Sequence, residues 1–409
     1  MLRILIVNDY ASVRGGADQV AITEASSLAE AGHSVKFACS LPGVIDNRLP
    51  SSGVEVCSPP VSGMGELKVG LLRGLWNVHL AQWLRRILKN PSEKPDIVHV
   101  HGWTKGFSPS LFTELGNAKI PYVVTLHDYV MACPNGAFYD FGSSEICHRR
   151  PLGASCLACN CDRVGRKEKL WRIARQHVAK QSARIPSRLP YVINVSRFSQ
   201  RIMTEFMPPT ASCCVLGNPI GIKKRPRLAT PKGAPFCFVG RFAREKGVEI
   251  LARASVMAKV KVRFVGAGEC EQVIRDIAPS SEIVGWKSSS EVHEIMQQST
   301  SVVFPSSWYE CQPLVPLEAS ALGVQSIVSD VCAAVESVKD GETGFHFFNG
   351  SVESLASKLT AAMQPGLADQ HGTAAYENYW SQPADPESHV NKLQAIYANM
   401  IISKRIGTD

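Results

Sequence analysis

Two carboxylates stand eight positions apart in the segment SSWYECQPLVPLEASALG, which spans residues 306–323. Glu310 lies in a polar, turn-like stretch, and Glu318 lies within an apolar run that is typical of a helix. Pro313 suits the first turn of that helix, whose unpaired backbone N–H groups favour a phosphate. Ionised carboxylates only accept hydrogen bonds, so the pair suits the hydroxyl groups of sugars. The competing interpretation is a capping carboxylate followed by a partly exposed helix residue.

A basic loop precedes this segment. VGRFAREKGV follows a strand-like run and contains Arg241, Arg244 and Lys246. A guanidinium and an ammonium at the carboxyl end of a strand can clamp a diphosphate, although charge runs are more often solvated surface. Further on, FVGAGE contains Gly266 and Gly268 but lacks the third glycine of a dinucleotide-binding fingerprint. A tight turn at the head of a helix is the competing interpretation there.

Five cysteines gather within 29 residues, and the segment CLACNC contains a C-x2-C spacing. They are Cys133, Cys147, Cys156, Cys159 and Cys161. Such a cluster suits a structural, tetrahedral zinc ion when thiols stay reduced. The spacing does not follow a standard zinc finger, so reduced thiols that pack a loop are the second interpretation. A catalytic thiol is not expected.

The elements that must position these groups alternate along the chain. Apolar strand-like runs such as RILIVN are followed by helical patterns, and the alternation pauses near residues 218–235, a proline-rich and basic linker. Two successive sets of this kind predict an α/β fold with two doubly wound, Rossmann-like parallel-sheet domains that face a cleft. We place these domains at residues 1–222 and 223–379. A shared ligand would bind at the carboxyl ends of the strands.

Two histidines, His99 and His101, alternate along the strand-like segment DIVHVHG and therefore share one face. Satisfied structural histidines are the first interpretation, and ligand contact is the second. Another histidine, His127, stands at the carboxyl end of the strand-like segment YVVTLHD. Its position favours a role in ligand contact.

Charge and hydropathy point to an anionic partner. The net charge of +8 suits a phosphate ligand, a membrane surface or a nucleic acid. Residues 71–89 alternate apolar and basic side chains, which predicts either an amphipathic helix on an anionic bilayer or a core helix. The start of the chain lacks the apolar core of a secretory signal, and no run approaches the ~18 apolar residues of a membrane span, so we expect a cytosolic protein.

Several motifs together resemble those of the family 4 glycosyltransferases, which have the GT-B fold. GRFAREKG, FVGAGE and PSSWYECQPLVPLEASALG occur in the family's order and spacing. The Gly15-Gly16 loop, TLHDY, NVSRFSQRI and GNPIGI extend the resemblance to the first half of the chain. It covers most of the chain apart from residues 40–95 and 133–190. By analogy with the family, a helix at about 380–409 packs back on the first domain.

The resemblance implies roles for the paired carboxylates and the basic loop. Glu310 would contact hydroxyls of the transferred sugar, and Glu318 would hold the nucleotide ribose. Arg241 and Lys246 would neutralise the leaving diphosphate. Gly266 belongs to the expected nucleotide-binding residues.

It also implies roles for residues at the edge of the cleft. Leu314 and Val315 would offer backbone N–H groups to the diphosphate, and Gly16 would let the first loop approach a phosphate or the acceptor. His127 would lie near the donor sugar. The chain departs from the family at Cys311-Gln312, where glycine and phenylalanine are frequent, so the identity of the sugar stays open.

The resulting expectation is a retaining glycosyltransferase. It would move a sugar from a UDP- or GDP-linked donor to a glycan or polyprenyl-linked acceptor in cell-surface polysaccharide or lipopolysaccharide synthesis. Residues 71–89 would hold it on the inner face of the cytoplasmic membrane. The chain lacks an Asp-x-Asp motif, which favours catalysis without a metal or other cofactor.

Other functions fit parts of the pattern. A nucleotide-sugar epimerase would share the fold and would turn over its substrate without an acceptor. A non-catalytic protein that binds a nucleotide sugar is a second alternative. A nucleic-acid-binding protein is the third, but the chain has no aromatic-rich RNA motif or zinc-finger spacing. Nucleic acid is therefore not an expected partner.

Overall fold

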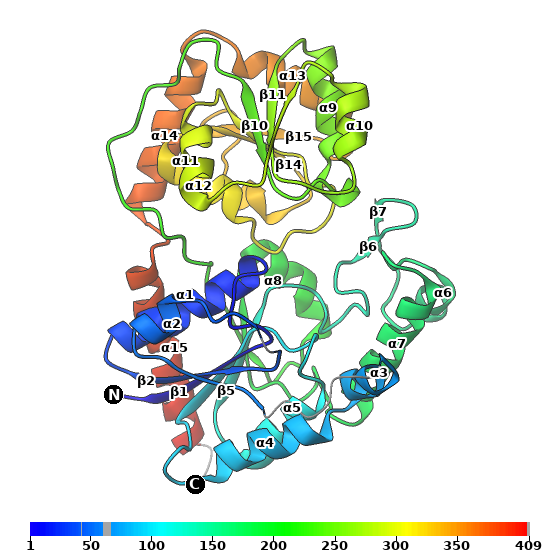
Figure 1. The fold of residues 1–409 in the computed structure, drawn as a ribbon, viewed down its shortest axis with the longest axis vertical. Coiled ribbons are helices and arrows are strands. Elements are labelled where there is room, and N and C mark those ends of the chain that lie inside the picture. The colour runs from blue at the N-terminus through cyan, green and yellow to red at the C-terminus, as the bar shows by residue number, and fades with distance from the viewer. Residues whose placement is uncertain (42, 60–66, 407–409) are drawn as a thin grey trace.

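Two parallel sheets lie one above the other in the computed structural model, which describes residues 1–41, 43–59 and 67–406 (Figure 1). The sheet of the first half has seven strands in the order β3-β2-β1-β4-β5-β8-β9. Its strands are β1 (Arg3–Asn8), β2 (Ser34–Cys39), β3 (Glu55–Cys57), β4 (Ile97–Val100), β5 (Tyr122–Leu126), β8 (Tyr191–Asn194) and β9 (Ser212–Val215). The helices of this half are α1 (Gly16–Glu30), α2 (Arg48–Ser51), α3 (Leu67–Leu75), α4 (Val78–Lys89), α5 (Ser110–Ala118), α6 (Ala154–Ala158), α7 (Arg166–Gln181) and α8 (Arg197–Met203), with a 3-10 turn, η1, at Thr204–Phe206.

The sheet of the second half has six strands in the order β12-β11-β10-β13-β14-β15. Its strands are β10 (Phe236–Val239), β11 (Val262–Val265), β12 (Glu282–Gly285), β13 (Val302–Phe304), β14 (Ser326–Ser329) and β15 (Gly344–Phe347). Its helices are α9 (Val248–Met257), α10 (Glu271–Ile277), α11 (Ser289–Gln297), α12 (Leu314–Leu322), α13 (Val352–Ala362) and α14 (Leu367–Ser381), with 3-10 turns η2 (Arg244–Lys246) and η3 (Ala333–Glu336). The last helix, α15 (Pro386–Ile406), follows.

The strands are apolar because helices cover both faces of each sheet. In β1 the residues after Arg3 are all buried, and the same holds for every residue of β4 and β5. All neighbours within the two large sheets are parallel, an arrangement that needs both faces covered. The fold class predicted from the sequence, two Rossmann-like domains, is therefore confirmed.

Each sheet changes winding direction at one place. The chain runs outward from β1 through β2 and β3, then returns to the other side of β1 with β4. In the second sheet β10 and β13 are the corresponding neighbours. Open parallel sheets bind ligands at these reversal points, beyond the carboxyl ends of the strands. The loops that follow β1 and β4 in the first sheet, and β10 and β13 in the second, therefore border the expected ligand site.

The last helix packs against the first sheet. Val390, Leu393 and Tyr397 of α15 are buried in the same apolar core as β1 and α1. The first sheet ends with β9 at residue 215 and the second begins with β10 at residue 236. The predicted boundary at 222/223 lies between them and stays a prediction. Residues 407–409 of the expected final helix lie outside the described residues.

The single helix expected at residues 71–89 is two helices. The side chain of Asn77 accepts a hydrogen bond from the Leu80 N–H and so starts α4 as an N-cap, which separates it from α3. Leu80 and Leu84 of α4 are buried in the core of the first domain. The apolar face of α4 thus covers the first sheet, while Leu72 of α3 is 69% exposed. Among the described helices, none has the length and apolar character to cross a bilayer.

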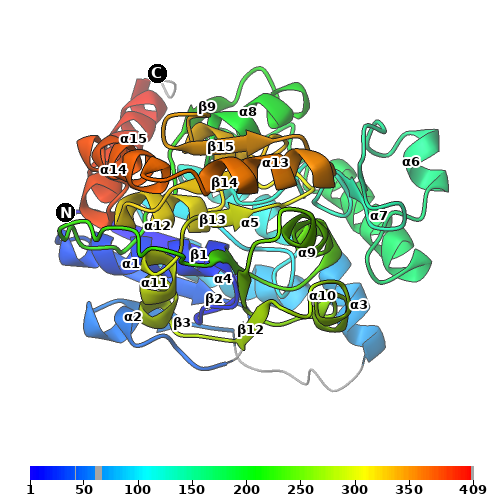
Figure 2. The same cartoon turned by 90° about the horizontal axis from the view of Figure 1, so that it is seen from above.

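The cysteine-rich segment projects from the first domain toward the second. Figures 1 and 2 both show α6 and α7 to one side of the stacked sheets, and Figure 1 shows the small antiparallel pair β6 (Tyr139–Asp140) and β7 (Glu145–Ile146) above α6. The Tyr139 hydroxyl lies 3.1 Å from Ser307 Oγ of the second domain. This segment therefore touches the loop that precedes Glu310.

Candidate active site

Glu310, in the loop after β13, is surrounded by side-chain hydrogen-bond donors. Its Oε1 accepts hydrogen bonds from Lys246 Nζ at 2.5 Å, Trp308 Nε1 at 2.6 Å and Ser306 Oγ at 2.8 Å. Burial alone would raise the pKa of Glu310, but Lys246 and the hydrogen bonds hold it below its ordinary value. The site therefore holds an ionised carboxylate in direct contact with a cation. Glu310 and Lys246, which the sequence analysis assigned to the same site, are therefore in contact.

Lys246 ends the short turn η2, beside the carboxyl end of β10. Its side chain is 21% exposed, and its Nζ lies 5.3 Å from the centre of the Trp308 ring. Gly247, which follows, has a φ of 70°, and a Cβ there would come within 1.9 Å of the Pro305 carbonyl oxygen. Only glycine fits, and this close approach brings the basic loop against the loop that carries Glu310.

Arg241 lies at the same strand end, but its guanidinium pairs with Glu245 at 2.8 Å. Arg163 from the cysteine-rich segment contacts the same Glu245 oxygen, so two guanidinium groups share one buried carboxylate. The Arg241 side chain is 49% exposed. It is therefore accessible as a cation, and it lines a cavity together with Trp308.

Two helix N-termini meet where the domains face each other. Helix α12 begins at Leu314, so the backbone N–H groups of Leu314 and Val315 lie in its first turn, as the sequence predicts. Helix α1 begins at Gly16, and a Cβ placed on Gly16 would lie 3.9 Å from Leu314 Cδ1. Both helix dipoles favour an anion at this place.

Glu318 lies one turn further along α12, on the same helical face as Leu314. Burial raises its pKa to about 7. The described residues give its carboxylate no hydrogen-bond partner. It is half-buried and ready to accept donors that the chain does not supply.

His127 belongs to a buried hydrogen-bonded chain. Its Nε2 lies 2.9 Å from His101 Nδ1, and His101 Nε2 lies 3.2 Å from Glu24 Oε2. The other Glu24 oxygen lies 2.8 Å from His389 Nε2, while His389 Nδ1 donates to the carbonyl of Gly217. Neither His101 Nε2 nor Glu24 Oε2 has a hydrogen-bond partner among the described residues, but the nearby carboxylate favours the His101 tautomer that carries its proton on Nε2. In that tautomer His101 Nδ1 accepts the Nε2–H of His127, so Glu24 favours one tautomer of His127.

The electrostatics of this chain agree with that assignment. Burial would raise the pKa of Glu24, but His101 and His99 hold it well below its usual range. Burial, together with His101, lowers the pKa of His127 to about 3. His127 is therefore a neutral imidazole at physiological pH, able to make a hydrogen bond without adding charge.

His99 matches the structural interpretation. Its Nδ1 bonds the Tyr397 hydroxyl at 2.8 Å and its Nε2 bonds Thr125 Oγ1 at 2.7 Å, so α15 is tied to the strands beneath it. Glu24, His99 and His101 also bring three ligand atoms within 4.8 Å of one another, a unique group of this kind among the described residues. Tyr397 already occupies the relevant nitrogen of His99, whereas Glu24 Oε2 and His101 Nε2 have no hydrogen-bond partner among the described residues.

Gly266 has a packing role. Its φ is +136°, and a Cβ there would come within 2.0 Å of the Gly240 carbonyl oxygen. The glycine therefore lets the loops after β10 and β11 lie against each other. Contact with a nucleotide stays a prediction for this residue.

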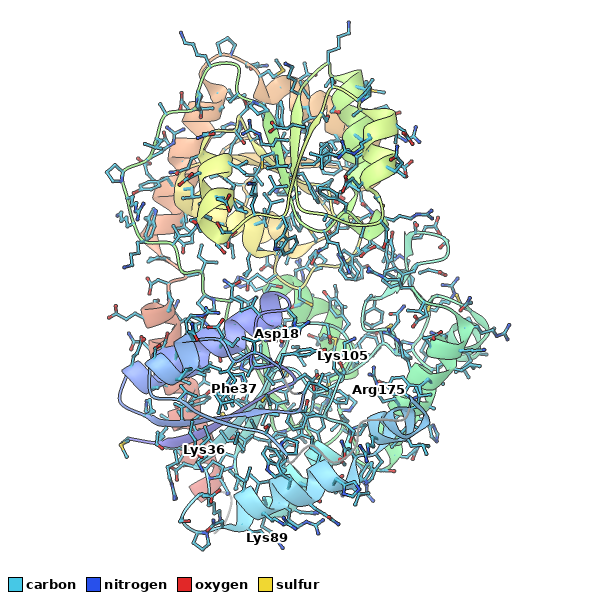
Figure 3. All side chains as sticks on the ribbon, viewed as in Figure 1. Asp18, Lys36, Phe37, Lys89, Lys105 and Arg175 are labelled. Carbon is cyan, nitrogen blue, oxygen red and sulfur yellow. The ribbon has the colours of Figure 1, made fainter. Side chains whose placement is uncertain are left out.

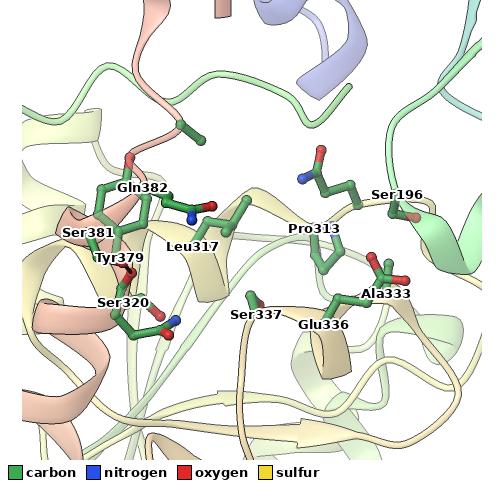
Figure 4. Close-up of a pocket in the computed structure, with 13 residues that line it drawn as sticks. Ser196, Pro313, Leu317, Ser320, Ala333, Glu336, Ser337, Tyr379, Ser381 and Gln382 are labelled. Carbon is green, nitrogen blue, oxygen red and sulfur yellow. Dashed lines mark hydrogen bonds between the residues drawn. The ribbon is translucent and has the colours of Figure 1, made fainter. Parts of the chain in front are cut away.

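A separate pocket of about 390 Å³ lies beside α12 (Figure 4). Pro313, Leu317 and Ser320 recur at helical spacing and line it, whereas Leu314 and Glu318 share the neighbouring face. Gln312 also lines it, and its Oε1 accepts a hydrogen bond from the Asn218 N–H at 2.5 Å. The residue that departs from the family pattern thus binds the interdomain linker.

The five clustered cysteines do not converge. Their sulfurs form no group of three within 4.8 Å among the residues that the structure describes. The Lys169 ammonium lies 3.0 Å from Cys161 Sγ and 3.5 Å from Cys156 Sγ, while Cys159 Sγ lies 3.1 Å from Asp140 Oδ2. This arrangement supports the interpretation of thiols that pack a loop, because a cation stands between two of the sulfurs.

Several residues at the site were not found from the sequence. Trp308 and Ser306 hold Glu310, and the only signal was their closeness along the chain. Arg163 lies in the segment outside the family resemblance, and it reaches Glu245 across the crevice. Glu24 had a signal that was overlooked, since it interrupts the apolar stripe of α1 between Val20 and Leu28.

Comparison with known proteins gives a consistent result. The family model of the glycosyl transferases group 1 matches residues 222–378, and that of the glycosyl transferase 4-like domain matches residues 15–219. The chain is 26% identical over 305 residues to the α-maltose-1-phosphate synthase of Mycolicibacterium smegmatis, covering 70% of this chain and 73% of that protein. It is 23% identical over 409 residues to the glycogen synthase of Mycobacterium tuberculosis, with coverage of 93% and 91%.

A solved structure shares the fold. The Anabaena protein HepE in complex with UDP-glucose superposes with a TM-score of 0.68 at 16% identity, covering 98% of this chain and 100% of that chain. At this identity the likeness concerns the arrangement of the two domains. It agrees with the GT-B fold that the sequence motifs imply.

Proposed function

Because this chain belongs to the glycosyl transferases group 1, with a glycosyl transferase 4-like first half, we propose that it moves a hexose from a UDP-linked donor to an acceptor hydroxyl with retention of configuration. The observation that carries the proposal is the contact between Lys246 and Glu310 beside the start of α12. A nucleotide sugar needs a cation for its diphosphate next to an acceptor of hydrogen bonds from its sugar hydroxyls, and Lys246 and Glu310 would supply these two groups. The UDP-glucose complex of HepE supports UDP as the nucleotide.

The charges of the site suit the chemistry. The bond between the anomeric carbon and the phosphate oxygen breaks, and the leaving diphosphate gathers negative charge. Lys246, Arg241 and the N–H groups of Leu314 and Val315 stabilise that charge, the electrostatic form of catalysis. The acceptor oxygen attacks from the same face, and its proton passes to the leaving phosphate oxygen.

The two carboxylates and the histidine hold the donor in place. Glu310 accepts hydrogen bonds from sugar hydroxyls through the oxygen that Lys246 does not occupy. Glu318 accepts from the ribose hydroxyls, which supply the donors that the chain does not. His127, neutral and oriented by His101, hydrogen-bonds the sugar near the transferred carbon.

We place the acceptor among lipid-linked or cell-surface glycans. The net charge of +8 and the exposed Leu71 and Leu72 of α3 support proximity to an anionic bilayer. The relatives named as glycogen and α-maltose-1-phosphate synthases make α-glucans the second candidate class.

The test is an assay of UDP release with UDP-glucose, UDP-galactose and UDP-N-acetylglucosamine, each with maltooligosaccharides or with polyprenyl-diphosphate glycans. We expect release that depends on both donor and acceptor, and NMR of the product should show the donor's anomeric configuration. Release without an acceptor accompanied by a new nucleotide sugar would show an epimerase instead. Absence of both nucleotide binding and release would contradict the proposal.

A further inference from the structure

A second cavity, of about 550 Å³, opens next to the proposed donor site. Loops after β4 and β5 form one wall, α7 forms another, and the second domain contributes Arg241 and Trp308. Trp308 is the residue whose indole N–H binds Glu310, so the cavity adjoins the reacting end of the donor. Phe141 and Trp171 give it aromatic walls, with Arg163 over the ring of Phe141 and Arg175 over the ring of Trp171.

Arg175 of α7 is the unusual residue of this cavity. It is 5% exposed, and its guanidinium stacks 5.2 Å from the Trp171 ring centre and 6.0 Å from that of Trp103. Its Nη1 donates to the Thr104 carbonyl at 3.3 Å, but its buried Nε has no hydrogen-bond partner. No carboxylate of the described residues lies within ion-pair distance of it. Burial lowers its pKa to about 10, which still leaves it a cation.

The neighbouring cations are arranged differently. Arg172 is paired with Asp162 at 2.9 Å, and Arg163 is paired with Glu245. Lys105 is exposed at the rim and makes no ion pair that the described residues show. Figure 3 labels Lys105 and Arg175 in the first domain. Both line the cavity, and neither is neutralised by direct contact.

Three carboxylates also line the cavity and limit its charge: Asp162, which pairs with Arg172, and the two exposed residues Asp128 and Glu168. Asp128 is exposed, and its Oδ1 accepts the Val130 N–H at 2.9 Å. Glu168 is exposed at the start of α7. Asp128 and Asp162 lie near enough to Arg175 to raise its pKa, but no carboxylate of the described residues forms an ion pair with it. A buried guanidinium that lacks a paired anion favours a ligand that brings one.

We propose that this cavity binds the acceptor through an anionic oxygen group, a carboxylate or a phosphate, held by Arg175 with Lys105 at the rim. The inference rests on the proposed glycosyl transfer and adds the chemical class of the acceptor. The guanidinium fork matches a carboxylate or phosphate in two hydrogen bonds. The sugar ring then lies against Trp171, with a hydroxyl directed toward Trp308 and Glu310.

Direct binding tests the cavity separately from catalysis. In the presence of saturating UDP, calorimetry would compare p-nitrophenyl β-D-glucuronide, glucose 1-phosphate and the neutral p-nitrophenyl β-D-glucoside. We expect at least one charged probe to bind about tenfold or more tightly than the glucoside. Preference for the glucuronide would identify an acidic sugar, and preference for the phosphate would identify a phosphorylated acceptor. Equal binding of all three probes would overturn the proposal.

Variants test whether Arg175 causes the preference for charged probes over the neutral glucoside. Arg175→Gln should remove it and leave UDP affinity unchanged, while Arg253→Gln, on the exposed face of α9, should change neither. Retention of the preference by Arg175→Gln would contradict the assignment. If that variant does not fold, Arg175→Lys and Lys105→Gln carry the test, and both should weaken the preference. If the wild-type protein does not bind UDP at all, that result would count against the proposed function and not against the acceptor site.

Discussion

At the scale of single residues, the site depends on carboxylates in different electrostatic settings. Glu310 is held ionised by Lys246, whereas the half-buried Glu318 has no counter-charge among the residues that the structure describes. The difference separates their tasks. Glu310 is ionised and can accept hydrogen bonds from sugar hydroxyls at any physiological pH. Glu318 becomes ionised only when the pH rises above its raised pKa or when a ligand stabilises its charge.

Glu310→Gln should lower kcat by about 10²- to 10³-fold, because an amide cannot replace the carboxylate that the sugar hydroxyls and Lys246 share. UDP affinity should stay nearly unchanged, since the diphosphate is bound by other groups. Initial rates and UDP titration by calorimetry would measure both effects. Wild-type rates in this variant would refute the role of Glu310.

The raised pKa of Glu318 leads us to expect that the affinity for the sugar donor depends on pH. Its pKa of about 7 in the free protein means that it carries a proton below that pH. Ribose hydroxyls bind best to the ionised form, so UDP-glucose affinity should rise by up to about tenfold per unit as pH approaches 7, then level off. Glu318→Gln should bind weakly and without this slope. A slope that persists in the variant would assign the titration to another group.

Local sequence was enough to predict which residues lie at strand ends close to one another, while their roles stay predictions. Glu310, Lys246 and the start of α12 follow strand ends, and strand ends of parallel sheets converge. Arg163, Arg175 and Glu24 act through tertiary contacts with partners 70 or more positions away, as between Arg163 and Glu245. Spacing along the chain carries no signal of such contacts.

At the scale of elements, helix α4 shows how one pattern fits two structures. An apolar stripe with basic neighbours suits a bilayer and a protein core equally. Here the stripe faces the core, and Arg85 is bound to Glu114 by two hydrogen bonds of 2.7 and 2.6 Å. The break at Asn77 was readable as an N-cap but was hidden by the continuous apolar pattern.

Leu84→Ala should lower the free energy of unfolding by about 2 to 5 kcal/mol, because Leu84 is fully buried in the core of the first domain. Leu72→Ala is the matched control and should change stability by less than about 0.5 kcal/mol, since Leu72 is mostly exposed. Denaturation with urea would measure both. Equal effects would show that α4 does not pack as described.

The arrangement of the five cysteines in residues 133–161 leads us to expect a specific result from metal analysis. Protein purified without chelator should contain no stoichiometric zinc, and a chelator should leave its melting temperature unchanged. The reason is that the Lys169 ammonium contacts both Cys156 and Cys161, and within the described part of the chain no three cysteine sulfurs lie within 4.8 Å of one another. One zinc ion per chain, lost together with stability, would show that the segment is a metal site.

At the scale of the whole molecule, the loop that carries Glu310 is held from both domains. Ser196 Oγ of the first domain donates to the Cys311 carbonyl at 2.5 Å, and the Cys311 side chain packs into the first domain's core. Helix α15 ties the end of the chain back to the first sheet. The α/β alternation predicted the two sheets, and the family resemblance implied that the last helix packs on the first domain. Neither predicted the contacts of the loop that carries Glu310, because those depend on how the domains face each other.

The most direct test of the account is a crystal structure of the complex with UDP. We predict the diphosphate between Lys246 and the N–H groups of Leu314 and Val315, with the ribose hydroxyls on Glu318. Lys246 should then contact a phosphate oxygen. A nucleotide bound away from α12, or a diphosphate that touches neither Lys246 nor the start of that helix, would contradict it.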